Sequence, residues 1–171
     1  GTVPSWRLFL GFAASIACAA VVGFAWGGAR ARTNGLIDQA ITEHVRSLQG
    51  AHLLDVASTD QHTVKPWFAG KLDFSPPVVD LASAGFPLTG GRLEYIEGHP
   101  AAALVFRRRL HTINLFIWPA GDAPQLRRRA ERTGFHLESW SDAGLNFLAV
   151  SELAPAELAT FAEKFRELRP D

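Results

Sequence analysis

Histidine is the residue type in this sequence best suited to metal binding or proton transfer. Six histidines stand at positions 44, 52, 62, 99, 111 and 136. No two of them have the i, i+4 spacing or the short His-x-His arrangement of a local ligand cluster. Histidines scattered in this way are usually surface or structural residues, so we predict no metal ligands and no cofactor.

Nucleophilic side chains are few and poorly placed for catalysis. Ser75 precedes Pro76 and Pro77 instead of a strand-to-helix elbow, and the sequence has no Gly-x-Ser-x-Gly motif. The single cysteine, Cys18, lies inside an uncharged hydrophobic run, so it supplies no internal disulfide and no thiolate for a folded domain. No pair of acidic residues stands out as an acid and a base. We therefore predict no catalytic residues and no enzyme activity.

Two arginine triplets, at 107–109 and 127–129, are the residues best suited to contact a phosphate backbone. If the first triplet is in a strand, alternation puts its middle arginine on the opposite face from the other two and divides the patch. The second falls in a stretch that we predict to be helical, beside Glu131, where a solvated face is the simpler interpretation. The chain also balances 17 basic against 17 acidic residues. No overall field draws it onto nucleic acid, and we predict no nucleic-acid partner.

The most distinctive stretch, His62–Leu81, combines three large aromatic residues with three prolines and two of the chain's three lysines. The prolines at 66, 76 and 77 exclude a long regular element, so we predict a structured loop with at most a helical turn near Trp67–Leu72. Two interpretations stay open. The aromatic residues either form a surface for a peptide or ligand, or fill the core while the charged residues pair locally.

The elements that position these residues begin with an uncharged run of 22 residues, Leu8–Ala29. At ~1.5 Å per residue it gives a helix of roughly 33 Å, which matches a hydrocarbon core of ~30 Å. Basic residues flank both ends, and tryptophans lie where interfacial anchors are expected. We predict a transmembrane helix at 8–29 after a juxtamembrane segment at 1–7. A cleaved signal peptide and a buried core helix are the alternatives.

Small residues recur every four positions in this run, at Ala19, Gly23 and Gly27. Such a face lets helix backbones approach closely and dimerise. We therefore predict a helix-dimer face at these three residues and, through it, a homodimer.

The rest of the chain reads as an α+β domain. Residues 30–50 have apolar positions at helical spacing and are predicted to form an amphipathic linker helix. Residues 51–171 then contain about five short runs rich in β-formers with turn signals between them, which predicts an antiparallel sheet. The predicted strands are Leu88–Ile96, Ala101–Arg108, Ile113–Trp118, Phe135–Trp140 and Leu145–Val150. The predicted flanking helices are Ala123–Arg132 and Pro155–Leu168, and Gly90-Gly91 is predicted to be a turn or bulge.

Three motifs carry a resemblance to a known family: VKPWFAGKLDF, FPLTGGRLEY and RRRLHTINLFIWP, followed by WSDAGLNFLAVSEL. Over about residues 60–153 the chain resembles the C-terminal region of proteobacterial transmembrane anti-sigma factors. The family's sensor-region motif carries over, with no chemical role attached, to Lys65, Pro66, Trp67, Phe68, Gly70, Lys71, Asp73 and Phe74.

The resemblance implies a regulator of an ECF-type sigma factor. Such proteins are single-pass inner-membrane proteins with a periplasmic region that senses a signal, passed on by regulated proteolysis or by a partner. The family's sigma-binding domain, often with zinc-binding residues, precedes the span and is absent from this chain; the lack of any methionine also suggests that Gly1 is not an initiator. We therefore expect a lipid bilayer, a sigma factor and a periplasmic protease or regulatory protein as partners. The alternative function is an envelope ligand-binding or structural protein with no transcriptional role.

Overall fold

Two sequence periods divide the chain: a helical period before residue 50 and a strand period after Pro87. The computed structural model describes residues 5–49, 53–121 and 127–168, with side chains from Cys18 onward except those of residues 127 and 128. The helices are α1 (Ser5–Leu48), α2 (Gln61–Phe68) and α3 (Pro155–Leu168), with a 3₁₀ turn at Ala82–Ala84. The strands are β1 (Val56–Ala57), β2 (Leu88–Ile96), β3 (His99–Arg108), β4 (His111–Pro119), β5 (Arg127–Arg132), β6 (Phe135–Asp142) and β7 (Leu145–Ser151).

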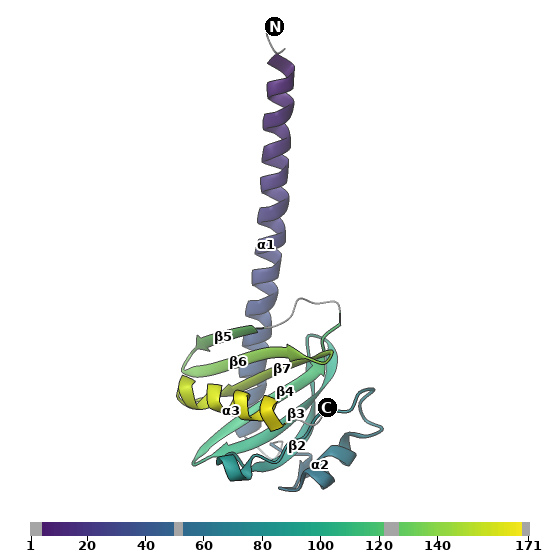
Figure 1. Ribbon diagram of the computed structural model, residues 1–171, viewed down its shortest axis with the longest axis vertical. Helices are drawn as coiled ribbons and strands as arrows, with labels where there is room; N and C mark the ends of the chain where they lie inside the picture. Colours follow the sequence, from purple (N-terminus) through teal and green to yellow (C-terminus); the bar gives the residue numbers. More distant parts are fainter. Residues whose placement is uncertain (1–4, 50–52, 122–126, 169–171) are drawn as a thin grey trace. The chain divides into compact units, whose positions relative to one another are not determined.

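The strands form one antiparallel sheet in the order β1-β2-β3-β4-β7-β6-β5 (Figure 1). Two-residue turns join several neighbours, and the turn at Glu97-Gly98 has φ angles of 51° and 81°. Both angles are positive, as in the turns whose twist matches that of paired strands. These tight turns hold the register, and the register decides which side chains share a face of the sheet.

One face of the sheet, here called the α3 face, is covered by α2 and α3 (Figure 1). Phe106 of β3 and Phe147 of β7 lie on it and pack with Phe161 and Phe165 of α3. The cluster is aliphatic and aromatic throughout. It is the main core of the domain, because apolar area removed from water supplies most of the driving force for folding.

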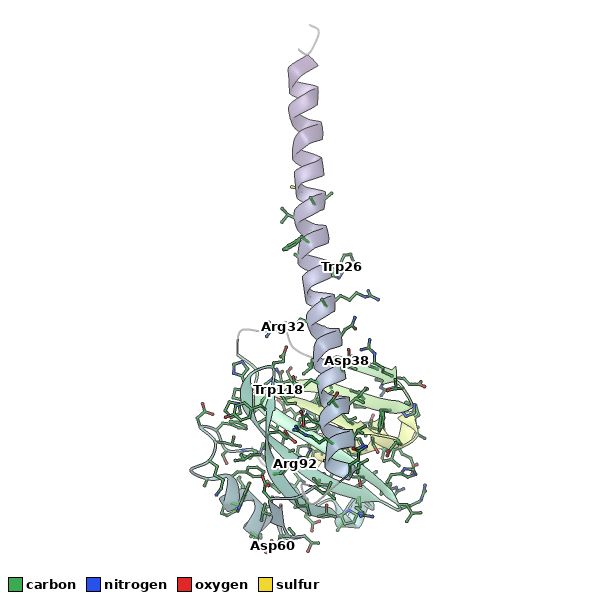
Figure 2. All side chains as sticks on the ribbon, turned by 180° about the vertical axis from the view of Figure 1, so that it is seen from behind. Trp26, Arg32, Asp38, Asp60, Arg92 and Trp118 are labelled. Carbon is green, nitrogen blue, oxygen red and sulfur yellow. The ribbon has the colours of Figure 1, made fainter. Side chains whose placement is uncertain are left out.

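The opposite face, here called the α1 face, is covered by residues 38–48, the last turns of α1, here called the docked segment (Figure 2). Strand pairing places Ala103, Phe116 and Leu148 on this face, in register with Arg92 of β2. All four of these side chains are buried. The α1 face therefore contains a buried charged residue, Arg92, whereas the buried cluster of the α3 face consists of apolar residues.

The chain divides into two compact units, residues 1–37 and residues 38–171. The first contains α1 up to Ile37. The second contains the docked segment, the whole sheet, α2 and α3. Each is described by itself below.

The predicted transmembrane helix at 8–29 is contradicted by the structure. Within the residues that the structure describes, no helix is both long enough and apolar enough to cross a bilayer. A span requires about 20 predominantly apolar residues.

The predicted sheet of about five strands is also corrected, because the sheet has seven. The five predicted strands are all present: β2 has the predicted bounds, and the other four are extended by one or two residues at one or both ends. The predicted helix at Ala123–Arg132 is wrong where it is described: residues 127–132 are β5, and residues 123–126 lie outside the described part of the chain. Arginine, alanine and glutamate favour helices, but this segment pairs with β6 at the sheet edge, where charged strands are common.

Two further predictions meet different outcomes. The helical turn expected near Trp67–Leu72 lies earlier, as α2 at Gln61–Phe68, because Asp60 caps its N-terminus by accepting a hydrogen bond from the His62 amide (2.8 Å). The bulge predicted at Gly90-Gly91 is confirmed by a register shift between β2 and β3. Gly90 has a φ of 149°, and a Cβ there would lie 2.1 Å from the Val56 carbonyl oxygen of β1. Only glycine lets β1 pair at this point.

Candidate functional site

A cluster of hydrogen-bonded polar side chains lies between the docked segment and the centre of the sheet. His44 and Ser47 are on the face of the helix that is buried against the sheet. The Nδ2 amide of Asn114, on β4, donates to Nδ1 of His44 (2.8 Å) and to Oγ of Ser47 (3.0 Å). Ser47 in turn donates to the His44 carbonyl oxygen (2.7 Å). Three buried polar side chains, His44, Ser47 and Asn114, thus join the helix to the strand. Together with Arg92 of β2 they are here called the polar cluster.

Arg92 of β2 is 3% exposed and extends the cluster sideways (Figure 2). Its Nη1 donates to Oδ1 of Asn114 and to the Leu53 carbonyl oxygen, both at 3.2 Å. Its Nε donates to Oε1 of Glu94 at 2.8 Å, and its guanidinium lies 5.8 Å from the centre of the Phe116 ring. A buried charge is tolerated only when it is paired and hydrogen-bonded in this manner.

The bonds of Asn114 determine the protonation state of His44. Oδ1 of Asn114 accepts from Arg92, so Nδ2 is the donor toward His44 and Nδ1 of that ring must carry no proton. Burial, with the nearby Arg92 charge as a second cause, lowers the pKa of His44 to about 4. The ring is therefore neutral near pH 7. Its Nε2 and the Nη2 of Arg92 are buried and have no hydrogen-bond partner among the described residues.

The rim of the docked segment is held by weaker contacts. Gln39 donates to the Tyr95 carbonyl oxygen (2.8 Å) and accepts from the Glu97 amide (3.1 Å). Asp38 forms an ion pair with Arg132 of β5. These contacts are more exposed than the polar cluster, and exposed ion pairs contribute little to stability.

At the other end of the docked segment, Arg46 pairs with Glu43 and lies 3.6 Å from Glu94 of β2. Burial and the Glu94 charge raise the pKa of Glu43, and Arg46 opposes that shift. The last turns of the docked segment therefore place a basic and an acidic side chain, Arg46 and Glu43, beside the polar cluster.

Chemically, the polar cluster can hold a helix in one register but shows no catalytic arrangement. His44 is neutral and its Nδ1 is occupied by Asn114. Ser47 donates to a backbone carbonyl and not to a base. Hydrogen bonds between side chains fix rotation and register of a helix more strictly than apolar contacts do.

The predicted sensor-region motif lies on α2 and the turn that follows it. Phe68 is fully buried in the core, and Trp67 and Phe74 pack against it. Lys71 donates to the Trp67 carbonyl oxygen (3.1 Å) and lies 4.6 Å from the centre of that indole ring. Core filling by the aromatic side chains, one part of the second open interpretation, thus describes Trp67, Phe68 and Phe74. The contacts of Lys71 are to a carbonyl oxygen and an aromatic ring and not to an opposite charge.

The remaining residues of the sensor-region motif are exposed: Lys65, Pro66, Gly70 and Asp73. Lys65 and Pro66 line a cavity of about 260 Å³. The polar cluster does not include any residue of the sensor-region motif, and the sensing role of that motif stays a prediction.

The predicted helix-dimer face, Ala19, Gly23 and Gly27, is exposed on α1. A Cβ added at either glycine would meet nothing within 4 Å, so both positions have open space. The homodimer stays a prediction.

The predicted absence of a metal site also stays a prediction. No group of three histidine, cysteine, aspartate or glutamate side chains that could hold a metal occurs in the described part of the chain. His52 lies outside that part.

The arginine triplet at 107–109 was predicted to divide by alternation, with Arg108 on the opposite face from the other two. Instead, Arg108 and Arg109 both pair with Glu157 of α3, because Arg109 lies in the turn after β3 with a φ of 54°.

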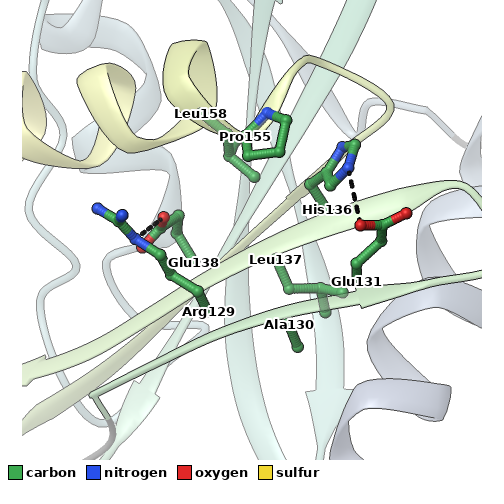
Figure 3. A pocket seen from close by; sticks show the side chains of 8 residues that line it. All are labelled: Arg129, Ala130, Glu131, His136, Leu137, Glu138, Pro155 and Leu158. Atoms are coloured by element: carbon green, nitrogen blue, oxygen red, sulfur yellow. Dashed lines mark ion pairs between the residues drawn. The ribbon is translucent and has the colours of Figure 1, made fainter.

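A second depression, of about 260 Å³, lies between β5, β6 and the start of α3 (Figure 3). Two contacts between ionisable side chains flank it: the ion pair of Arg129 Nε with Glu138 Oε1 at 2.6 Å, and His136 Nε2 at 3.6 Å from Glu131 Oε2. Burial raises the pKa of Glu138, and Arg129 opposes the shift. The ionisable side chains around this depression thus contact each other at its rim.

Sequence reasoning missed the polar cluster. The helical spacing of residues 30–50 was recognised, but His44 and Ser47 were not identified as its sheet-facing polar positions. The available signal was the asparagine in the apolar run Ile113–Trp118 and the arginine in β2, since polar residues within apolar strands need buried partners. Which residues those partners are depends on the tertiary fold.

Comparisons with known proteins return no relative. No protein-family model, no curated protein and no solved structure matches the chain.

Proposed function

We propose that residues 38–171 are the signal-receiving part of an anti-sigma regulator that controls an ECF sigma factor by holding or releasing the docked segment. The resemblance motifs support this proposal. FPLTGGRLEY contains Arg92 and RRRLHTINLFIWP contains Asn114, so two of the three motifs contribute residues to the polar cluster.

The single observation that carries the proposal is the hydrogen bonding of His44 and Ser47 to Asn114 on the α1 face. When a helix leaves such a site, water replaces the lost hydrogen bonds, and a typical bond contributes only ~1 kcal/mol net. Docked and released states can then differ by a few kcal/mol. That gap is within reach of a ligand or partner that prefers one state.

The connection to an effector is supplied by α1 itself. It is one helix from Ser5 to Leu48, so the docked segment is continuous with the N-terminal unit. A change in how residues 38–48 are held is then a change at one end of that helix. This is the type of output that a regulator without catalytic groups can provide.

The first test is a pull-down with the intact gene product as bait, in its own host, followed by identification of the bound proteins. Recovery of an ECF sigma factor is the expected result. If the intact protein is expressed and captures no sigma factor, the proposal is contradicted.

The second test asks whether the docked segment controls the output, with a reporter gene under the promoter of that sigma factor. Asn114→Ala removes the bonds to the helix and is expected to change reporter activity several-fold. The matched control is Asn146→Ala, since Asn146 is also buried on the α1 face but accepts its hydrogen bond from Ser141 within the sheet. Equal reporter activity in both variants would contradict control through the docked segment.

A further inference from the structure

A cavity of about 320 Å³ opens where the docked segment ends beside β2. It is lined by Arg46, Ser47, Asp55, Arg92, Leu93 and Glu94. The cavity is thus bounded by the helix on one side and by β2 with the chain leading into β1 on the other. It is separate from the depression at β5 and β6 and from the one beside α2.

Several lining groups retain hydrogen-bonding capacity. Asp55 uses Oδ2 to accept from the Leu93 amide (3.0 Å), and its Oδ1 accepts from no donor among the described residues. Arg46 is 67% exposed in its side chain and turns only one terminal nitrogen, Nη2, toward Glu43 and Glu94. Arg92, although 3% exposed, has a buried Nη2 without a partner among the described residues. The cavity therefore offers donors and an anionic acceptor together.

The charges around the cavity exclude a simple anion or a simple cation as the best ligand. Two guanidinium groups, Arg46 and Arg92, are balanced by Asp55 and Glu94, with the further carboxyl of Glu43 next to them. A lone anion would be repelled by the carboxylates, and a lone cation would leave Nη2 of Arg92 without an acceptor. A buried donor without an acceptor costs about 1–3 kcal/mol.

We propose that this cavity binds a small zwitterion, an α-amino acid or a dipeptide, with its ammonium group toward Asp55 and its carboxylate toward Arg46 and Arg92. Carboxylate recognition by guanidinium groups and ammonium recognition by a carboxylate are both charge-assisted hydrogen bonds. At roughly 30 Å³ per water, the cavity has room for about ten waters, which suits a ligand of that size. It lies at the low end of the volumes typical of small-molecule sites, ~300–1,000 Å³.

This inference deepens the proposed function, on which it rests for its biological meaning. Arg46 and Ser47 belong to the docked segment, whereas Asp55 and Arg92 belong to the sheet side of the cavity. A zwitterion that contacts both sides binds the docked state better than the released state. Its binding therefore stabilises docking, by linkage.

The test is isothermal titration calorimetry of the full 171-residue chain with glycylglycine and with L-alanine, and with acetate and ethylamine as the two half-ligands. We expect saturable binding of at least one zwitterion with a Kd below about 1 mM, and at least about tenfold weaker binding of either half-ligand. Hydrogen exchange of the docked-segment amides should slow when the zwitterion is bound.

Two variants locate the binding. Asp55→Asn removes the charge but keeps an oxygen that can accept from the Leu93 amide, and Arg46→Gln changes an exposed side chain, so both should fold. Each should weaken zwitterion binding at least about tenfold. Arg129→Gln, at the separate depression beside β5, is the matched control and should leave the Kd unchanged.

The inference is overturned if neither zwitterion binds, if a half-ligand binds as tightly as the zwitterion, or if Asp55→Asn and Arg46→Gln leave the Kd unchanged. The titration uses purified protein without a sigma factor. Failure to bind would therefore leave a positive pull-down intact, and failure of the pull-down would leave a measured Kd intact.

Discussion

The two faces of the sheet are built on different physical principles. On the α3 face, aromatic rings pack against each other, with Phe106 and Phe161 centres 5.1 Å apart and Trp140 stacked on Phe147 at the same separation. On the α1 face, Asn114 hydrogen-bonds His44 of the docked segment at 2.8 Å. Both faces are buried. The buried contacts of the α3 face are apolar, whereas those of the α1 face also include hydrogen bonds between buried polar side chains.

Because of this difference, we expect the α3 face to supply most of the stability of the domain and the α1 face to allow the docked segment to be released. Apolar burial on the α3 face is non-directional and strong, so α3 and the sheet should unfold together. The α1 face has a smaller net stabilisation per contact, because its polar groups exchange protein partners for water on release. The docked segment is thus the element of this domain best placed to detach while the rest stays folded.

The largest expected effect is on the α3 face. Phe161→Ala removes a fully buried ring and should lower the free energy of unfolding by about 3–5 kcal/mol. Urea denaturation followed by tryptophan fluorescence measures it. Phe24→Ala is the control, since Phe24 is 87% exposed on α1, and it should change stability by less than about 0.5 kcal/mol. A small loss in Phe161→Ala would contradict the assignment of the main core.

Acidification should weaken the α1 face. The pKa of His44 is about 4 in the folded protein against 6.5 ordinarily, so the unfolded or released state binds more protons between these values. The stabilisation is complete above pH 6.5 and is lost as pH falls through 6.5 toward 4. At ~1.4 kcal/mol per pKa unit, the loss approaches about 3 kcal/mol. Urea denaturation at a series of pH values measures it.

The control for the pH series is His44→Gln, whose side-chain oxygen can accept from Asn114 but does not titrate. Glu43 has a raised pKa and so contributes in the opposite direction, with its stability contribution increasing as pH falls. The difference between wild type and His44→Gln isolates the histidine. A wild-type curve parallel to that of the variant from pH 6.5 to 4 would rule out the buried neutral ring.

Two asparagines on the α1 face should differ in the effect of their replacement by alanine. Asn114→Ala leaves Arg92 and His44 without their shared partner and should cost about 1–3 kcal/mol. Amide hydrogen exchange should accelerate in the docked segment while β3 and β4 stay protected. Asn146→Ala should leave the docked segment protected, since its bond is to Ser141. Uniform acceleration over the whole sheet in Asn114→Ala would show that the two faces unfold together.

The smallest effect is expected at the rim of the docked segment. Arg132→Gln removes the ion pair with Asp38, in which the two side chains are 37% and 60% exposed. The loss should be at most about 1 kcal/mol and should shrink with added salt. Thermal melts at low and high ionic strength measure it. If Arg132→Gln lowered the free energy of unfolding as much as Asn114→Ala, the rim of the docked segment and not the polar cluster would be its main attachment.

Much of the sheet could be predicted because its signals are local. Alternating apolar residues and turn dipeptides marked β2, β3, β4, β6 and β7, and the stripe that begins at Pro155 marked α3. The register shift at Gly90 followed from a local glycine pair. β5 was missed because its composition favours a helix and only pairing with β6 makes it a strand. β1, with two residues, is too short to show a period.

The sequence by itself determined the α+β class, five of the seven strands and α3, since each depends on the period of neighbouring residues. The tertiary structure alone decided the polar cluster. Asn114 and His44 are 70 residues apart in the chain, and Arg92 lies 22 residues from Asn114. Hydrogen bonds act over about 3 Å, so contacts between such distant residues exist only once strand register and helix docking have brought them together.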